Sequence, residues 1–173
     1  CESIVRQVGD DLPARVIIAH LGNGVSVTAV ARGRSIDTSM SLTPAGGVMM
    51  GTRCGDLDPG VLIYLMREKR FDAAQLEALV NRQSGLLGLS GIASDMRSLR
   101  QAAEQEPDEA SNSTADARLA IAMFCYAIRK QIAAMIAALD GLDLLVFAGG
   151  IGEHDPAVRA AICDGLSWLG VRL

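Results

Sequence analysis

Near the start of the chain, three short apolar runs are separated by glycine-containing turns. Residues 15–21 are rich in β-branched side chains and predict a buried strand. Residues 25–31 alternate between apolar and polar positions and predict its partner strand, and residues 34–39 predict a third. Gly22-Asn23-Gly24 and Arg32-Gly33-Arg34 lie between the runs and carry turn signatures. The pattern therefore predicts an antiparallel meander.

After a long loop, the pattern becomes helical. Three capping signals predict helix starts, at Asp58 followed by Pro59, at Asp72, and at Ser94-Asp95. Residues 84–91 are punctuated by glycines and predict a loop between the second and third of these helices.

The second half of the chain has the strongest apolar periodicity. Between Ala115 and Leu139, apolar residues recur every three or four positions, which predicts one long helix. Residues 144–148 are an unbroken apolar run that predicts a buried central strand. Gly149–Gly152 interrupts the run, and Asp155-Pro156 begins another helix. The order predicts an α/β fold: a mixed sheet of three antiparallel strands and then a parallel strand, flanked by helices.

Composition and charge narrow the function. The chain has 173 residues, enough for one domain with its own core, and half of them are apolar. The net charge is −4 without a basic block, which argues against binding to nucleic acid or to an anionic membrane. The most apolar window, residues 132–151, contains Asp140 and Asp143, so we expect a buried helix and a strand rather than a bilayer span.

The cysteines and the two ends of the chain give further expectations. Cys1, Cys54, Cys125 and Cys163 form no C-x-x-C pair, so we expect no zinc site and a reducing, cytoplasmic location. The chain opens without Met and ends at residues 170–173, which read as the entry to another strand. We therefore expect a piece of a longer polypeptide.

The segment from Asp37 to Pro59 is too irregular for a strand or a helix and too apolar for a disordered linker. Ordered loops of this length are usually functional. Arg53 lies near its end between two glycines, and its planar guanidinium could bind a phosphate or a carboxylate. The alternative is a buried structural loop in which Arg53 pairs with Asp56 or Asp58.

Two glycine segments that follow expected strands are candidate phosphate sites. Residues 20–24 could let backbone N–H groups approach a phosphate, with His20 and Asn23 as further donors. The alternative is a hairpin turn that binds nothing. Gly149–Glu153 precedes a helix, as in sites that hold a nucleotide beside a helix N-terminus, although it could equally be a close-packed turn. Neither the dinucleotide G-x-G-x-x-G pattern nor a P-loop is present.

Asp95 is a third candidate. Its carboxylate could accept hydrogen bonds from a ribose, with Met96 and Arg97 beside an adenine; the alternative is a helix cap next to a surface Arg. His154 stands alone near a helix start and reads as the neighbour of a cap rather than a catalyst. No Ser/His/Asp or Cys/His arrangement supports nucleophilic catalysis.

Taken together, these motifs resemble the acetate kinase family of short-chain carboxylate kinases. The matching segments follow the family's order and cover nearly the whole chain: residues 20–26, 37–59, 84–91, 94–97 and 146–153. The family belongs to the acetate and sugar kinase/Hsp70/actin superfamily, which has two ribonuclease-H-like domains. The resemblance implies that residues 1–173 are part of the second, nucleotide-binding domain, incomplete at both ends.

The resemblance also implies an activity and a set of site residues. The reaction is the reversible transfer of the γ-phosphoryl group of ATP to acetate, which gives acetyl phosphate and ADP with Mg²⁺, in a homodimer. Arg53 is implied to stabilise the transition state, and no metal ligand is implied within this chain. The residues implied to hold the ATP phosphates and the adenosine are His20, Leu21, Gly22, Asn23, Gly24, Asp95, Met96, Arg97, Gly150, Ile151, Gly152, Glu153 and His154.

Some positions depart from the family pattern. Ser41 replaces a usual Gly, Ala45-Gly46 replaces Leu-Glu, Cys54 replaces Ser, and His154 replaces Asn within the nucleotide site. The family's first domain, which holds most of the acyl pocket, is expected upstream of Cys1. Two alternatives therefore stay open: a propionate or butyrate kinase, and a non-catalytic nucleotide-binding or assembly module of actin-like fold.

Overall fold

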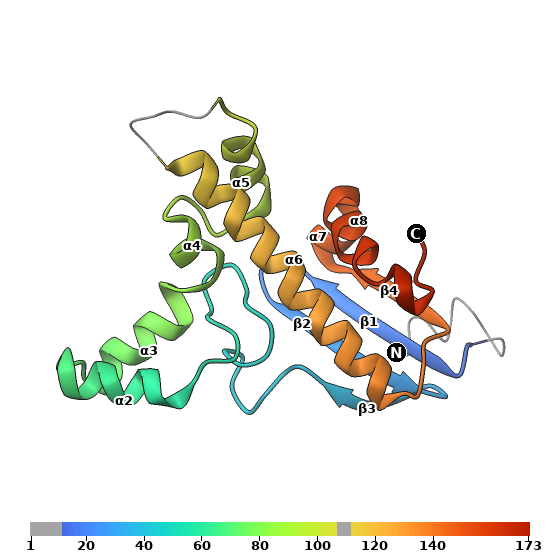
Figure 1. Ribbon diagram of the computed structural model, residues 1–173. Coiled ribbons are helices and arrows are strands. Elements are labelled where there is room, and N and C mark those ends of the chain that lie inside the picture. Colours follow the sequence, from blue (N-terminus) through green and yellow to red (C-terminus); the bar gives the residue numbers. More distant parts are fainter. Residues whose placement is uncertain (1–11, 107–111) are drawn as a thin grey trace. The chain divides into compact units, whose positions relative to one another are not determined.

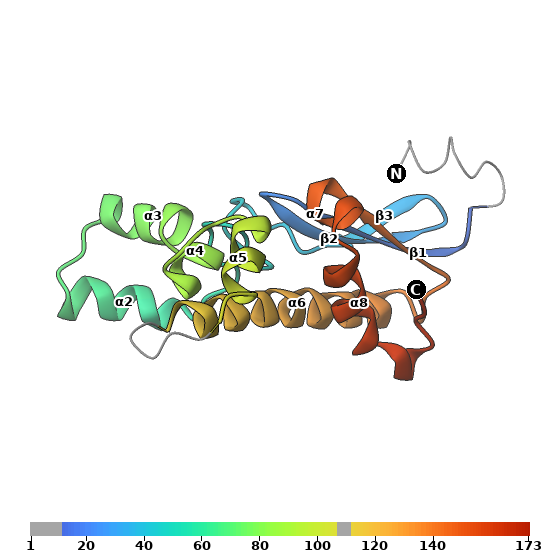
Figure 2. The ribbon, with the colours of Figure 1, turned by 90° about the horizontal axis from the view of Figure 1, so that it is seen from above.

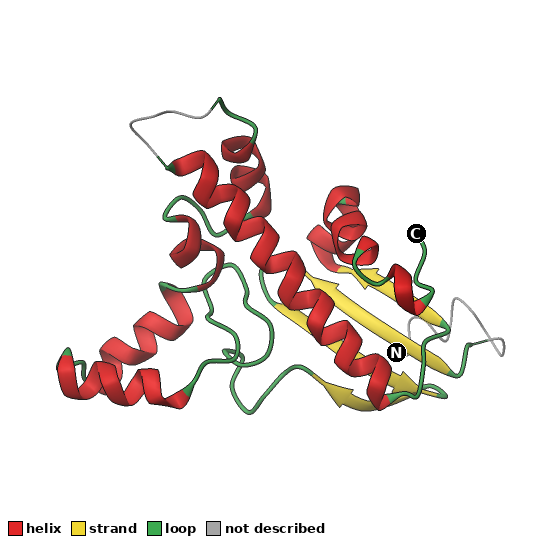
Figure 3. Cartoon of the chain, in the orientation of Figure 1, coloured by secondary structure: helices red, strands yellow, loops and turns green. Residues whose placement is uncertain are grey.

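The computed structural model describes residues 12–106 and 112–173, so Cys1 lies outside the described residues. The chain divides into two compact units. The sheet unit runs through Met40 and again from Cys125 to Leu173, and the helical unit is Ser41–Phe124. Helix α6 (Ser113–Ala138) contributes its first half to the helical unit and its second half to the sheet unit. All four described strands belong to the sheet unit (Figures 1 and 3).

The sheet confirms the predicted strands. Its strands are β1 (Arg15–Leu21), β2 (Val25–Ala31), β3 (Arg34–Thr38) and β4 (Leu144–Ala148), in the order β3-β2-β1-β4. β1 pairs antiparallel with β2, β2 pairs antiparallel with β3, and β4 pairs parallel with β1. The prediction of a central position for β4 is wrong for the described sheet. β4 is an edge strand, and all five of its residues are half-buried because only one side of its backbone is paired.

The two hairpin turns differ in geometry. Arg32 and Gly33 connect β2 to β3 and both have left-handed backbone (φ 48° and 79°), as a two-residue type I′ turn requires. Residues 22–24 connect β1 to β2, and none of them has a positive φ. Their loop is closed by a hydrogen bond of 3.0 Å from the Gly22 N–H to the Gly24 carbonyl. The Asn23-Gly24 pair is therefore part of a three-residue loop rather than an Asn-Gly turn.

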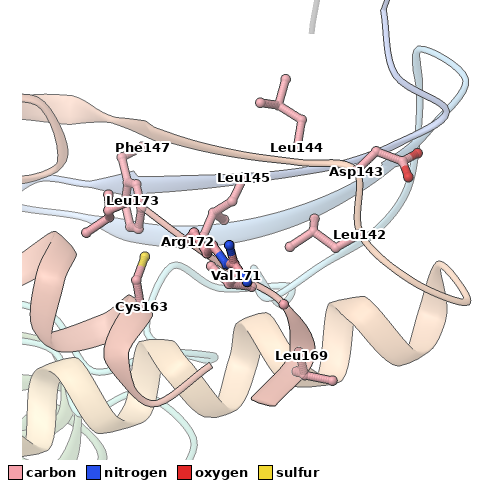
Figure 4. Close-up of a pocket in the computed structure, with 11 residues that line it drawn as sticks. Leu142, Asp143, Leu144, Leu145, Phe147, Cys163, Leu169, Val171, Arg172 and Leu173 are labelled. Atoms are coloured by element: carbon pink, nitrogen blue, oxygen red, sulfur yellow. The ribbon is translucent and has the colours of Figure 1, made fainter. Parts of the chain in front are cut away.

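Alternation along the strands gives the sheet one well-packed face. Six paired residues of β1 and β2, each at most 2% exposed, lie on this face: Ile17, Ala19, Leu21, Val25, Val27 and Ala29. In Figure 4, Leu145 of β4 points toward α8 and α6, whereas Leu144 points to the opposite side. Helix α8 (Pro156–Asp164) and the second half of α6 lie on the same side of the sheet (Figure 2). Their apolar residues complete the core of the sheet unit.

Helix α6 confirms the expected long apolar helix. By length and composition alone, it could also cross a membrane. Its apolar stripe is, however, buried within the protein, at positions that include Phe124, Ile128 and Ile132, each 0% exposed. The expectation of a buried helix followed by a strand is thus met by α6 and β4.

The helical unit contains α2 (Pro59–Glu68), α3 (Ala73–Arg82), α4 (Gly85–Ser90) and α5 (Met96–Ala103). The three predicted caps are confirmed, because Asp58, Asp72 and Asp95 each accept a hydrogen bond from a backbone N–H in the first turn of α2, α3 and α5 respectively. The prediction of a loop at residues 84–91 is wrong. Gly85 begins a short helix and Gly91 ends it, both with left-handed backbone (φ 63° and 65°), and Gly88 lies within the helix.

Candidate active site

In the sheet unit, the candidate site lies where β1 and β4 end. The two strands are parallel, so their carboxyl ends meet at the same edge of the sheet. The loop of residues 22–24 follows β1, and helix α7 (Gly149–His154) follows β4. A Cβ placed on Gly149 would lie 2.7 Å from the Leu21 carbonyl oxygen and 3.1 Å from Cε1 of His20. The structure thus brings together the two glycine segments that the sequence singles out.

Helix α7 itself differs from the sequence interpretation. The glycines were expected to separate a strand from a helix, but Gly149 and Gly150 already belong to the helix. Gly149 has φ 79° and has no room for a side chain beside β1, so its glycine is required by the fold. Gly152 is buried, and a Cβ there would contact Phe147 at 3.4–3.5 Å and Leu21 at 3.7 Å. Gly152 therefore packs α7 against the ends of both strands.

Gly150 and Gly22, unlike Gly149, have room for a side chain in the described fold. Gly150 is exposed, and no atom lies within 4 Å of a Cβ placed on it. At Gly22, such a Cβ would have ordinary contacts of 3.6 Å with the Gly24 carbonyl oxygen and with Nε2 of His20. Neither residue has a positive φ. The missing side chain of Gly150 leaves open space, and Gly22 lies beside the exposed His20, so a ligand could approach the backbone of both segments.

The ends of α7 are held by side chains. The carboxylate of Glu153 accepts a hydrogen bond of 3.2 Å from the Gly149 N–H. Nη1 of Arg159, on α8, donates to the carbonyls of Gly152 (2.8 Å) and Glu153 (2.9 Å). Arg159 is a residue that the sequence interpretation missed, because its role depends on the packing of two helices. His154 ends α7 and is exposed.

In the helical unit, the backbone around Arg53 is fixed by hydrogen bonds. The Cys54 N–H donates to the Val80 carbonyl (3.0 Å), and the Ser84 N–H donates to the Thr52 carbonyl (3.0 Å). The Met50 N–H donates to the carbonyl of Arg53 itself (3.1 Å). The segment is therefore attached to the end of α3 and the start of α4 rather than hinged on its glycines.

The guanidinium of Arg53 has few partners. Arg53 as a residue is half-buried, and its Nη1 lies 3.4 Å from both the Pro44 carbonyl oxygen and the Met50 sulfur. Within the part of the chain that the structure describes, it forms no salt bridge. Asp56 accepts from the Gly47 N–H (2.7 Å) and Asp58 from the Gly60 N–H (2.9 Å), so both carboxylates serve their own loops. The pairing considered as the alternative for Arg53 is absent, and most of its N–H donors remain available to a ligand.

Cys54, the departure next to Arg53, does not provide a nucleophile. Its thiol donates to the Gly55 carbonyl (3.0 Å). Burial, followed by the nearby carboxylate of Asp56, raises the pKa of Cys54, whereas its own backbone hydrogen bond opposes this rise. The thiol therefore stays neutral at pH 7.

Asp95, Met96 and Arg97 open helix α5. Oδ1 of Asp95 accepts a hydrogen bond of 2.9 Å from the Ser98 N–H. This backbone hydrogen bond is the largest cause that lowers the pKa of Asp95, followed by the hydrogen bond from the Ser98 side chain. Met96 is buried and Arg97 is exposed, so Met96 anchors the helix start while its two neighbours face solvent. The cap that the sequence offered as an alternative is thus present.

We expect Asp95→Ala to lower the free energy of unfolding by about 1 kcal/mol at pH 7, as for other N-caps. The pKa of Asp95 is lower in the folded state than its ordinary value of 3.8. The ionised carboxylate therefore stabilises the fold above pH 3.8, and this stabilisation is lost as the pH falls through the folded pKa. The difference from wild type in urea titrations should therefore shrink below pH 3.8. Asp95→Asn keeps a capping oxygen and should lower the free energy of unfolding by less than Asp95→Ala does. An equal decrease in both variants would show that capping is not the cause.

The described residues do not form a metal cage. Among residues 12–106 and 112–173, no group of three or more His, Cys, Asp or Glu side chains could hold an ion. One hollow of about 290 Å³ lies between β4 and the segment after α8 (Figure 4). It is lined mainly by apolar residues, among them Leu145, Phe147 and Cys163, and by none of the predicted site residues. Residues 171–173, which border it, form no strand.

The fold and these segments define a mixed α/β protein with glycines at the ends of two parallel strands and an Arg that has no carboxylate partner among the described residues. The family model described as the Acetokinase family matches residues 2–173, so the chain belongs to this family. The acetate kinase of Brachyspira hyodysenteriae is 50% identical over 159 residues, which are 92% of this chain and 38% of the relative. That of Thermosynechococcus vestitus is 51% identical over 158 residues, which are 91% and 36% of the two chains.

Solved structures give the same result. The crystal structure of Porphyromonas gingivalis acetate kinase matches 98% of this chain and 41% of its own, with a TM-score of 0.88 and 40% identity. The structure of a propionate kinase from Francisella tularensis matches 97% and 41%, with a TM-score of 0.86 and 40% identity. The chain thus spans well under half the length of these relatives.

Proposed function

We propose that the protein containing this chain transfers the γ-phosphoryl group of ATP to acetate, reversibly, and forms acetyl phosphate and ADP. Membership in the acetokinase family supports the reaction class. The observation that carries the proposal within this chain is Arg53, a half-buried residue on fixed backbone whose guanidinium has no carboxylate partner among the described residues. A positive charge held in this way is suited to an anionic group that arrives with the substrates.

The chemistry asks for charge stabilisation rather than for a base. The carboxyl group of acetate has a pKa of about 4–5 and is already an anion at pH 7. The remaining task is to align two anions and to stabilise the charge on the transferring phosphoryl group. We assign this stabilisation to Arg53, because a guanidinium can donate to two phosphoryl oxygens at once.

We assign nucleotide binding to His20–Gly24, Asp95–Arg97 and Gly150–His154. Leu21 is buried, so only its backbone is offered to a ligand, whereas His20 and Asn23 are exposed. The Glu153 carboxylate is used within α7, and we infer that this residue contributes through its backbone. Mg²⁺ is expected to arrive with ATP, held by the substrate phosphates and by at most one or two protein carboxylates, and we assign it no ligand among the residues of this chain.

We further propose a cytoplasmic homodimer that binds neither nucleic acid nor membrane. The net charge of −4 supports the absence of a nucleic-acid surface. Helix α2 supports association, since none of its residues is buried and several large apolar side chains are exposed: Val61, Ile63, Tyr64 and Met66. A second copy of the protein would cover such a surface.

The test is turnover by the full-length protein with Mg·ATP and acetate, propionate or butyrate in parallel, read as acyl hydroxamate. We expect acetate to give the highest kcat/KM. The similarity to a propionate kinase favours propionate as the second candidate, and a higher kcat/KM with propionate would replace acetate by it. No turnover with any of the three acids, despite ATP binding, would instead establish a non-catalytic nucleotide-binding module.

Gly150 provides a test of the nucleotide site. Because its missing side chain faces open space, Gly150→Leu should not destabilise the fold and should favour the helical state of α7. A side chain in the ligand's place should nevertheless weaken ATP binding by about tenfold or more, which corresponds to ~1.4 kcal/mol. Calorimetry and thermal unfolding of the full-length variants would check both, with Gly150→Ala as the small control. Unchanged affinity in Gly150→Leu would remove α7 from the site.

A further inference from the structure

Helix α7 is a poor helix by its own sequence. Three of its six residues are glycines, and glycine is the least favourable helix residue after proline. A helix of this length is also far too short to be stable alone. Its conformation must therefore be imposed by its surroundings, which matters because the proposed function places the nucleotide against this segment.

Helix α7 is held by three neighbouring elements, β1, β4 and α8. Gly152 packs against Phe147 and Leu21, and the Glu153 carboxylate caps the Gly149 N–H. The last carbonyls of a helix have no partner within the helix. In α7, two of them accept from a single nitrogen, Nη1 of Arg159. The positive charge also suits the negative end of the helix.

Arg159 is itself well anchored. Helix α8 begins with Asp155 at its N-cap, whose Oδ1 accepts from the Val158 N–H (3.0 Å). Val158 and Ile162 of α8 are fully buried in the core of the sheet unit. Arg159 therefore connects a segment that is weak by sequence to a helix that is fixed by the core.

We propose that Arg159 is a positioning residue for the nucleotide: it fixes α7 in the conformation that binds, without touching the ligand itself. The proposal rests on the proposed function of α7. Without Arg159, only a fraction of the molecules would hold α7 in the competent form, and the apparent affinity falls in proportion to that fraction. Bound nucleotide restores the conformation, so the chemical step should be preserved.

The test compares Arg159→Met, which has no donors, with Arg159→Lys, whose ammonium can donate to both carbonyls as Nη1 does. The matched control is Arg118→Met, since Nε of Arg118 donates to the Ala103 carbonyl (2.9 Å) at the end of another helix, α5. In the full-length protein, we expect Arg159→Met to raise the Kd for ADP about tenfold while kcat at saturating ATP stays within about threefold. Arg159→Lys should recover most of the affinity, and Arg118→Met should match wild type.

Hydrogen–deuterium exchange without nucleotide separates positioning from general stability. Arg159→Met should speed exchange in residues 149–154 and leave β1 and β4 protected, and ADP should remove the difference. Unchanged ADP affinity in Arg159→Met would overturn the proposal. Failure of this variant to fold, or lost protection across the sheet, would overturn it too, because Arg159 would then hold the whole unit. If wild type binds no ADP, the proposed function is wrong. Hydrogen–deuterium exchange without nucleotide then still shows whether Arg159 orders α7.

Discussion

Replacement of Arg53 by Ala in the full-length protein should lower turnover by about 10³-fold or more, as for other arginines that stabilise phosphoryl transfer. The nucleotide Kd should change by less than about threefold, because the contact is made mainly in the transition state. The physical basis is a charge without a carboxylate partner among the described residues, on backbone fixed by hydrogen bonds to Val80 and Ser84. The measurements are acyl hydroxamate formation and calorimetry with ADP.

Two further variants show which property of Arg53 turnover depends on. Arg53→Lys keeps the charge but not the planar fork, so its turnover should fall between those of wild type and Arg53→Ala. Arg82→Ala removes an exposed arginine from the last turn of α3 and should leave turnover unchanged. Turnover of Arg53→Ala within tenfold of wild type would show that Arg53 is structural.

Gly85→Ala should be the most damaging small substitution in the helical unit. Gly85 has φ 63°, and a Cβ there would overlap the Met50 carbonyl oxygen and lie 2.8 Å from that of Arg53. We expect a loss of about 3 kcal/mol or more in the free energy of unfolding, from left-handed strain and overpacking together. Turnover should fall as well, because the clash displaces the backbone that carries Arg53.

Gly91 offers a matched control for this prediction. It stands at the other end of α4 with nearly the same backbone conformation (φ 65°), but no atom lies within 4 Å of a Cβ placed on it. Gly91→Ala should therefore cost only the left-handed strain, about 1 kcal/mol, with turnover intact. Urea unfolding of both variants gives the comparison. Equal decreases in the free energy of unfolding would show that the close contact of Gly85 with the Arg53 segment does not add to the loss.

The parts of the fold that follow from local signals were predictable. The strands β1 and β2 follow from β-branched runs and alternation, and the starts of α2, α3 and α5 follow from Asp caps whose hydrogen bonds are made within one turn. The same signal bears on the site, since Asp58 caps α2 in the structure and does not pair with Arg53, which was the alternative that the sequence left open.

The elements that were missed depend on contacts distant in sequence. Helix α4 forms because the N–H groups of Leu86 and Leu87 donate to the carbonyls of Met50 and Gly51, which the local pattern of residues 84–91 does not reveal. Helix α7 is glycine-rich and is held by Arg159 from the next helix. The edge position of β4 reflects which strands pair with it, whereas its apolar run reports only burial.

In the candidate site too, local features were predictable and features that depend on distant contacts were not. Motifs identified Arg53 and the glycine segments as residues of interest, because their types and spacing are visible in the sequence. Which glycine the fold needs was not visible: Gly149 has left-handed backbone and no room for a side chain beside β1, whereas a Cβ would meet only ordinary contacts at Gly152 and open space at Gly150. That distinction depends on backbone angles and neighbouring atoms, which only the structure supplies.

The central claim is that Arg53 acts on the transferring phosphoryl group rather than on the bound nucleotide. The most direct test is calorimetry of Mg·ADP with the full-length protein, with and without acetate and aluminium fluoride, a planar stand-in for that group. For wild type, we expect acetate and aluminium fluoride together to tighten ADP binding by about 100-fold or more, as for a transition-state analogue. Arg53→Ala should bind Mg·ADP alone like wild type and lose this enhancement. Full retention of the enhancement in Arg53→Ala would contradict the account.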